Sequence, residues 1–344
     1  MNTSRIDIAN IVLMIVSCIL AFVVPFELFL FSYAVLGPLH YLTEITWLHK
    51  RDYFTNGKYD YIWLIVLCAV LFLLSFVFTD APQNASNFLI YLAFASALGF
   101  VLFKDWLFKI GFVGIAAIIG GLIVKTPTFF FLFAVFLPTL IHVFLFTGLF
   151  ILFGALKSKS VTGVLSLVVF AACGISFFVF FPHFSFYTIS DYAQKTLVDS
   201  GFSMVNQSFL HIFKLGTTAR ETVFSSDIGF GIMRFIAFAY TYHYLNWFSK
   251  TSVIKWHQVP RQWLAVVIGL WLLSVGLYAY DYKTGLIALY FLSMLHVFLE
   301  FPLNYRSFIG IGEEIGVLTG LRKPPVPATA TVPTVKKGKA KNSR

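Results

Sequence analysis

Residues 128–156 read "TFFFLFAVFLPTLIHVFLFTGLFILFGAL", a stretch of 29 residues without a single Asp, Glu, Lys or Arg. A membrane-spanning helix needs about 20 predominantly apolar residues, so this stretch is long enough to cross a bilayer. The whole chain has the same character, since 59% of its 344 residues are hydrophobic, 12% are charged and 42 are Phe. Soluble domains are about a quarter charged. The sequence therefore predicts an all-α, polytopic transmembrane bundle.

Ten apolar stretches are candidate membrane helices, and Pro25 separates the first two. The fourth and fifth are short, which leaves open that they form a re-entrant pair. Because consecutive spans pack together, we expect residues 1–306 to form one transmembrane bundle. The predicted spans are 6–24, 26–48, 60–79, 88–103, 110–124, 128–156, 161–181, 229–248, 263–280 and 284–303.

The basic residues are distributed unevenly between the two sides of this predicted bundle. With the N-terminus inside, the inner segments hold 19 Lys and Arg residues and the outer segments hold 5. Basic residues accumulate on the cytoplasmic side of membrane proteins. We therefore expect both termini to lie on the cytoplasmic side of the membrane. The membrane that we expect is the cytoplasmic membrane of a bacterium.

Two segments outside the spans have a distinct composition. Residues 182–228 form the longest outer segment, and apolar positions at helical spacing predict one or two amphipathic helices there. Residues 307–344 form a cytoplasmic tail whose end is rich in Pro, Ala, Thr and Lys. Such a composition is typical of disorder and of contact with anionic membrane lipids. Since the tail carries much of the net charge of +10, that charge does not indicate a nucleic-acid partner.

Four histidines lie inside predicted spans that all run in the same direction, from outside to inside. Each precedes the basic end of its helix, and a rise of about 1.5 Å per residue allows all four to lie at a similar depth. A lone histidine in a membrane helix more often hydrogen-bonds to a neighbouring helix. Four at one depth favour a shared site. These residues are His40, His142, His243 and His296.

Two of these helices also carry a glutamate four residues after the histidine. They read "LGPLHYLTE" (36–44) and "LSMLHVFLE" (292–300), which places His and Glu on one helix face. Asn304 extends the second stripe by another turn. Burying an ionisable residue in hydrocarbon costs several kcal/mol, so such residues usually serve a function.

Imidazole and carboxylate together favour Fe, Zn, Mn or Cu over Ca²⁺ or Mg²⁺. Each glutamate is then a metal ligand, or it orients the ring of its own or a neighbouring histidine. Cys18, Cys68 and Cys173 lie in apolar runs and are interpreted as small core residues. The predicted metal ligands are His40, His142, His243, His296, Glu44 and Glu300.

The layout of single histidines on separate membrane helices resembles the Brp/Blh family of membrane carotene dioxygenases. The family's Pro-His-Gly element is replaced here by Gly37-Pro38-Leu39-His40. The resemblance implies a membrane enzyme that binds iron through its histidines. More generally, a metal site in a Phe-rich bundle predicts a metal-dependent oxidoreductase, of the oxygenase or hydroxylase type, with a hydrophobic, lipid-like small-molecule substrate. The sequence does not identify an electron donor.

Two other classes of function remain open on the sequence alone. Ionisable residues inside a bundle also mark proton or ion paths, so a coupled transporter is one alternative. Facing pairs of histidines can also hold haem, and a haem-binding or non-catalytic membrane subunit is the other alternative. The chain has no CxxCH, so a haem would be bound non-covalently.

Overall fold

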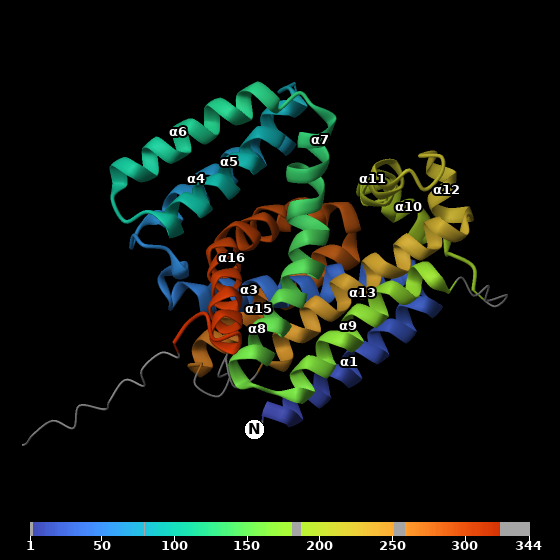
Figure 1. Cartoon of the computed structure of the whole chain (residues 1–344). Coiled ribbons are helices and arrows are strands. Elements are labelled where there is room, and N and C mark those ends of the chain that lie inside the picture. The colour runs from blue at the N-terminus through green and yellow to red at the C-terminus, as the bar shows by residue number, and fades with distance from the viewer. Residues whose placement is uncertain (1–2, 79, 181–186, 251–258, 324–344) are drawn as a thin grey trace, which may run out of the picture.

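The computed structural model of the chain describes residues 3–78, 80–180, 187–250 and 259–323, and the end of the predicted tail lies outside them. Within these ranges every regular element is a helix, which confirms the all-α class (Figure 1). The elements are α1 (Thr3–Val23), α2 (Pro25–Phe31), η1 (Ser32–Leu36), α3 (Gly37–His49), η2 (Asp52–Phe54), α4 (Asp60–Phe76), α5 (Gln83–Leu102), α6 (Trp106–Ile123), α7 (Pro127–Phe129), η3 (Phe130–Phe146), α8 (Thr147–Ser158), α9 (Val161–Val179), α10 (Asp191–Asp199), α11 (Ser203–Phe213), α12 (Arg220–Ser225), α13 (Asp227–Ser249), α15 (Arg261–Tyr280) and α16 (Tyr282–Leu318).

Eight helices in the described ranges are long and apolar enough to cross a membrane, which supports a multi-pass membrane protein. α5 and α6, predicted as short spans, are 20 and 18 residues long and are both among the eight. α4 has 17 residues, and α13 is not among the eight. The predicted number of ten spans and the predicted side of the termini therefore stay predictions.

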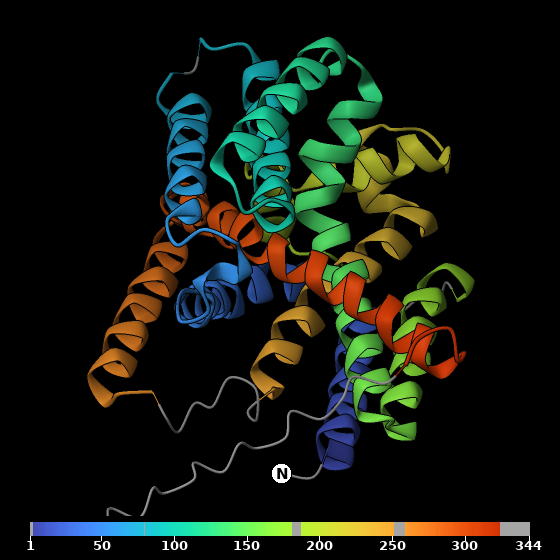
Figure 2. The ribbon, with the colours of Figure 1, turned by 60° about the vertical axis from the view of Figure 1, so that its left-hand side comes forward.

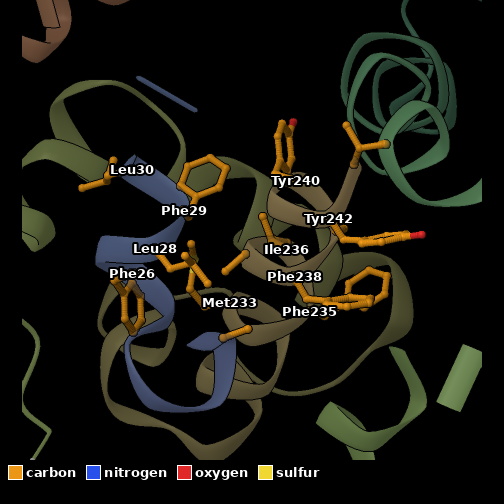
Figure 3. Close-up of a cluster of buried hydrophobic side chains, with 14 of the residues drawn as sticks. Phe26, Leu28, Phe29, Leu30, Met233, Phe235, Ile236, Phe238, Tyr240 and Tyr242 are labelled. Atoms are coloured by element: carbon orange, nitrogen blue, oxygen red, sulfur yellow. The ribbon is translucent and has the colours of Figure 1, made fainter. Parts of the chain in front are cut away.

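One group of helices is built around α13, most of whose residues are buried. α1, α2 and α9 pack against it, and α1, α9 and α13 lie side by side in Figure 1. Figure 3 shows the interior of this group, where Phe26 and Phe29 of α2 lie beside Met233 and Ile236 of α13. These side chains are at most 3% exposed. α13 is therefore an internal helix, with protein rather than lipid on nearly all of its surface.

A second group consists of α4, α5 and α6, which pack against one another in chain order. Its core includes Leu64, Phe94 and Phe298, so α16 contributes to it. α16 also contacts α8 and α3, and Figure 2 shows it crossing the molecule between the two groups. The segment η3–α8 likewise contacts α5 and α13. The elements that join the two groups are thus α3, η3–α8 and α16.

Two of the joining segments depart from α-helical geometry. η1 and η3 are π-helical, and η3 contains Pro138. Proline lacks the N–H that an α-helix needs, and π-helical turns are frequently found at functional sites. Pro38 lies in the first turn of α3, directly after η1. Both irregular segments adjoin or contain a predicted ligand.

The short helices α10, α11 and α12 follow one another at one end of the molecule (Figure 1). α10 and α11 are the amphipathic helices predicted in residues 182–228, and the six-residue α12 follows them. α16 continues to Leu318, beyond the predicted boundary of the bundle at residue 306. The three cysteines are free, as predicted, and Cys68 and Cys173 are buried.

Candidate metal centre

Four helical segments bring the four predicted histidines into one cluster. His40 comes from α3, His142 from η3, His243 from α13 and His296 from α16. The centroids of the His40 and His243 rings are 4.7 Å apart, and those of His142 and His296 are 5.2 Å apart. Each side chain is at most 6% exposed. The cluster thus lies where the two helix groups meet.

The two glutamates join the cluster in different ways. Glu44 Oε2 lies 3.1 Å from Nε2 of His40, its own partner one turn earlier in α3. Glu300 Oε2 lies 3.2 Å from Nδ1 of His142, which belongs to another helix. Glu44 thus lies beside the histidine of its own helix, and Glu300 lies beside the histidine of a neighbouring helix.

The ring nitrogen atoms of the cluster lie close to one another. His40 Nε2 and His243 Nε2 are 3.2 Å apart. Donor atoms of His40, His142 and His296 all lie within 4.8 Å of one another, so this trio can hold a metal ion. With metal–nitrogen bonds of about 2.0–2.1 Å, neighbouring ligands are about 3.0–3.4 Å apart. The spacing between His40 and His243 falls in this range, whereas the spacing within the trio, at up to 4.8 Å, is wider.

Several polar atoms of the cluster make no hydrogen bond in the described part of the chain. They include Oε2 of Glu44 and of Glu300, and both ring nitrogens of His142. The contacts of the glutamates with histidine are short but lack hydrogen-bond geometry. Leaving a buried polar group unsatisfied costs about 1–3 kcal/mol, and more for a charged group. A cation among these atoms would satisfy them, so the residues fit a metal.

One further residue holds a histidine in the orientation that a ligand needs. Thr147 Oγ1 is 2.8 Å from Nδ1 of His243 in a buried hydrogen bond. This contact leaves Nε2 of His243 directed at His40. Partners of this kind fix the ring and the tautomer of metal-binding histidines. Thr147 was not predicted, because its pairing with His243 depends on how η3–α8 packs against α13.

Aromatic rings and a close helix contact surround the cluster. The ring centroids of Tyr244 and Trp247 lie 5.2 and 5.6 Å from that of His40. Trp247 Nε1 donates a 3.0 Å hydrogen bond to Thr43 Oγ1, which fixes α13 against α3. A Cβ on Gly37 would lie 3.3 Å from the Tyr244 hydroxyl, so a glycine keeps the helices close. These walls keep the cluster dry.

Polar residues continue from the cluster toward the end of α13. Asn304, predicted one turn beyond Glu300, is buried, and its side-chain atoms make no hydrogen bond in the described chain. Lys250, which ends α13 and is half-buried, interacts electrostatically with Glu44 and Glu300. It lies beyond ion-pair distance, so no Lys or Arg in the described ranges contacts either carboxylate.

The fold and this cluster define a multi-pass helical membrane protein with a buried histidine-rich site that can hold a metal ion. No protein-family model matches the chain, and neither a curated protein nor a solved structure matches it. What the cluster does must therefore be argued from its own chemistry.

Proposed function

We propose that the protein is an integral-membrane, metal-dependent oxidoreductase of the oxygenase or hydroxylase type that acts on a lipid-like substrate. The observation that carries this proposal is the buried trio of His40, His142 and His296, which can hold an ion, beside two glutamates that each have an oxygen without a hydrogen bond in the described chain. This donor set suits borderline first-row metals, and iron is the first candidate. The likeness in layout to the Brp/Blh family favours the same metal.

The residues of the chain have separable roles in this proposal. His40, His142, His243 and His296 would hold the ion, with Glu44 and Glu300 as ligands or as partners of the rings. Bound iron would supply the one-electron chemistry with dioxygen that inert C–H or C=C bonds require. Aromatic walls exclude water, which strengthens electrostatic interactions inside the site and limits side reactions.

The packing of the cluster is unfavourable for haem. Two axial imidazoles stand about 4 Å apart, twice a metal–nitrogen bond of about 2.0–2.1 Å, with the macrocycle between them. Nε2 of His40 and Nε2 of His243 are only 3.2 Å apart, and the rings of His142 and His296 fill the space beside them. A haem would require these helices to separate.

One observation favours a second candidate, a proton-coupled transporter. Glu44, Glu300, Asn304 and Lys250 continue the polar cluster toward one end of α13. Such a row of ionisable residues inside a bundle is typical of a proton relay. In that role the cluster would need no metal.

Metal content separates these two functions. Protein purified in detergent under anaerobic, iron-replete conditions would be analysed by plasma mass spectrometry and by its absorption spectrum. We expect one or two equivalents of iron, no Soret band, and loss of iron in His40→Ala and in His296→Ala. His211→Ala, at an exposed histidine on α11, is the matched control and should keep its iron. Folded protein without metal would overturn the proposal and favour the transporter.

A further inference from the structure

Trp247 and Trp47 form a run of aromatic contacts that leads from the metal cluster to the surface of the protein. The ring centroid of Trp247 lies 5.6 Å from that of His40, and the ring centroid of Trp47 lies 5.6 Å from that of Trp247. Trp247 is 9% exposed, whereas Trp47 is half-buried. Two indole rings therefore separate a predicted metal ligand from the surface.

The other rings beside the cluster lead further into the bundle. Tyr41 and Tyr244, which also contact cluster histidines, are at most 5% exposed. Tyr244 continues to Tyr240, which is buried as well. Within the described ranges, Trp247 is thus the neighbour of the cluster whose next ring contact is with a partly exposed side chain.

The two indoles are fixed by the contact between α3 and α13. Trp247 Nε1 of α13 donates a 3.0 Å hydrogen bond to Thr43 Oγ1 of α3. The Trp247 plane meets the planes of His40 and Trp47 at 87° and 90°. Edge-to-face contacts of this kind are favourable between aromatic rings. Because His40, Thr43 and Trp47 all belong to α3, the whole run lies within one helix–helix contact.

The surface end of this run is surrounded by positive charge. The Arg51 guanidinium lies 3.9 Å from the centroid of the Trp47 ring. The Arg306 guanidinium of α16 lies 6.0 Å from the centroid of the Phe54 ring, which is 5.8 Å from that of Trp47. Arg51, Arg306 and the neighbouring Lys50 are exposed. We call Trp47, Lys50, Arg51 and Arg306 the Trp47 patch.

The charge balance around the Trp47 patch is positive. Residues 104–109 adjoin residues 50–60 through the ion pair between Lys109 and Asp60. These two segments and Arg306 together hold six Lys and Arg residues and three Asp residues. Since Lys109 and Asp60 cancel each other, the positive excess does not depend on that pair. Complementary charge across an interface speeds association and selects the partner, so an acidic protein surface fits this patch.

Basic residues gather at the cytoplasmic ends of membrane helices in general, so charge alone does not select a partner here. The additional feature of this patch is the indole under Arg51. Trp and Arg are enriched among the residues that contribute most to protein–protein binding. The same indole is the surface end of the path to His40, and a lipid head group would have no use for such a path.

We propose that the Trp47 patch docks a soluble one-electron carrier protein with an acidic face, and that electrons pass from it through Trp47 and Trp247 to the metal site. This inference rests on the proposed function and narrows it to the hydroxylase type. A hydroxylase places one atom of dioxygen in its substrate and reduces the other to water, so it needs electrons from an external donor. In each transfer the carrier loses one electron to the metal site, and no bond forms or breaks.

Binding of a carrier can be measured without any need for metal. The full chain in phosphatidylcholine nanodiscs would be immobilised, and a plant-type [2Fe–2S] ferredoxin, an acidic one-electron carrier, would be the probe in biolayer interferometry. We expect Lys50→Gln with Arg51→Gln, and separately Trp47→Ala, to weaken binding at least about tenfold at low salt. Lys157→Gln with Lys159→Gln is the matched control, because it removes two exposed cations from the predicted cytoplasmic side outside the patch.

The same measurement separates a protein partner from the membrane surface. If the patch serves only to contact anionic lipid, its variants would bind ferredoxin as the original protein does in phosphatidylcholine. That result would overturn the proposal. Equal losses in the patch variants and in the control variant would overturn it too, because net charge rather than the Trp47 patch would then govern binding.

Stopped-flow absorbance tests the path itself. Oxidised, iron-loaded protein would be mixed with saturating reduced ferredoxin, and the reduction of iron would be followed. Transfer slows steeply when a ring contact is lost, so Trp247→Leu should remove the fast phase without weakening binding, and Trp247→Phe should retain much of it. Trp263→Leu, at an exposed position of α15, is the control. Trp47→Leu at saturating ferredoxin gives the same test if Trp247→Leu loses its iron.

The metal-site variant His40→Ala separates this inference from the proposed function. We expect it to lose iron and to bind ferredoxin with unchanged affinity, because the Trp47 patch contains no predicted metal ligand. Iron-loaded protein that does not bind ferredoxin, or that is reduced equally fast in Trp247→Leu, would overturn the inference and leave the oxidoreductase standing. Protein that binds ferredoxin at the patch but never contains metal would overturn the oxidoreductase and leave the docking surface standing.

Discussion

Two carboxylate sites in the interior of this protein differ in the groups that surround the carboxylate oxygens. Asp60 receives both contacts of the Lys109 ammonium group, at 2.6 and 2.8 Å, and a 2.9 Å hydrogen bond from the Gly57 amide. Glu44 and Glu300 instead lie against imidazoles, at 3.1 and 3.2 Å, without hydrogen-bond geometry. The first site is complete as it stands. The second is an array of electron-pair donors that no Lys or Arg of the described ranges contacts, as expected of a set of metal ligands.

The largest expected effect is a loss of stability when the ion pair of Asp60 and Lys109 is broken. Lys109→Met leaves Asp60 in a buried position without its cation, and removing one partner of a buried pair costs about 3–5 kcal/mol. We expect about the lower end of this range, because the Asp60 side chain is still 13% exposed. Thermal unfolding in detergent would measure the loss, and metal content should not change.

The double variant Asp60→Asn/Lys109→Met is the control for this effect. Since it removes both charges, it should recover most of the stability lost in Lys109→Met. A Cβ on Gly57 would collide with the same carboxylate and lie 2.7 Å from Lys109 Nζ, so Gly57→Ala should weaken the pair as well. Loss of iron in Lys109→Met would show that the two sites are not independent.

The next largest effect concerns the metal affinity of the site that contains Glu44 and Glu300. Glu44→Gln and Glu300→Gln remove the negative charge but keep the size of the side chain. If these carboxylates neutralise a cation, each variant should lower metal affinity at least about tenfold, and the two together by more. Competition with a chelator during metal loading measures this. Unchanged affinity would mean that the glutamates are only neutral partners of the rings.

The helices could be predicted from the sequence because a membrane helix needs a long run of apolar residues, which is visible in the sequence. Long apolar runs, interrupted by Pro25 and by charged turns, place most spans to within a few residues of the observed helices, but α16 continues to Leu318, well beyond the predicted end of its span at residue 303. Hydrophobicity does not, however, encode the hydrogen-bonding pattern within a helix. The π-helical geometry of η1 and η3 was accordingly not predicted.

The candidate site could be predicted only in part, for a related reason. The four histidines were found because ionisable residues in apolar spans are rare. The pairing of Glu300 with His142, rather than with His296 on its own helix, depends on how α16 is rotated against η3. The contact between Thr147 and His243 depends on a similar rotation. Neither contact can be predicted from the spacing of residues along one helix.

A smaller effect should follow from that second contact. Thr147→Val keeps the shape of the side chain and removes the hydrogen bond to Nδ1 of His243. Losing a partner that orients a metal-binding histidine lowers metal affinity by about 10–100-fold, and a single hydroxyl should lie near the lower limit. Thr147→Ser, which retains the hydroxyl, should bind metal as the original protein does. A Thr147→Ser variant as weak as Thr147→Val would point to packing instead.

The smallest effect concerns a polar contact beside the cluster that is already satisfied. Trp247→Phe removes the donor to Thr43 Oγ1, but that hydroxyl still donates to the backbone carbonyls of Leu39 and His40, at 2.7 and 2.9 Å. The net loss should be about 0.5–1.5 kcal/mol, seen in thermal unfolding, with metal content unchanged. The Trp247 ring centroid lies 5.6 Å from that of His40. Loss of iron in Trp247→Phe would therefore mean that any change next to the cluster weakens metal binding. Retention of iron would show that metal binding depends on the atoms of the histidine–glutamate cluster that lack a hydrogen bond, and not on how close a residue lies to the cluster.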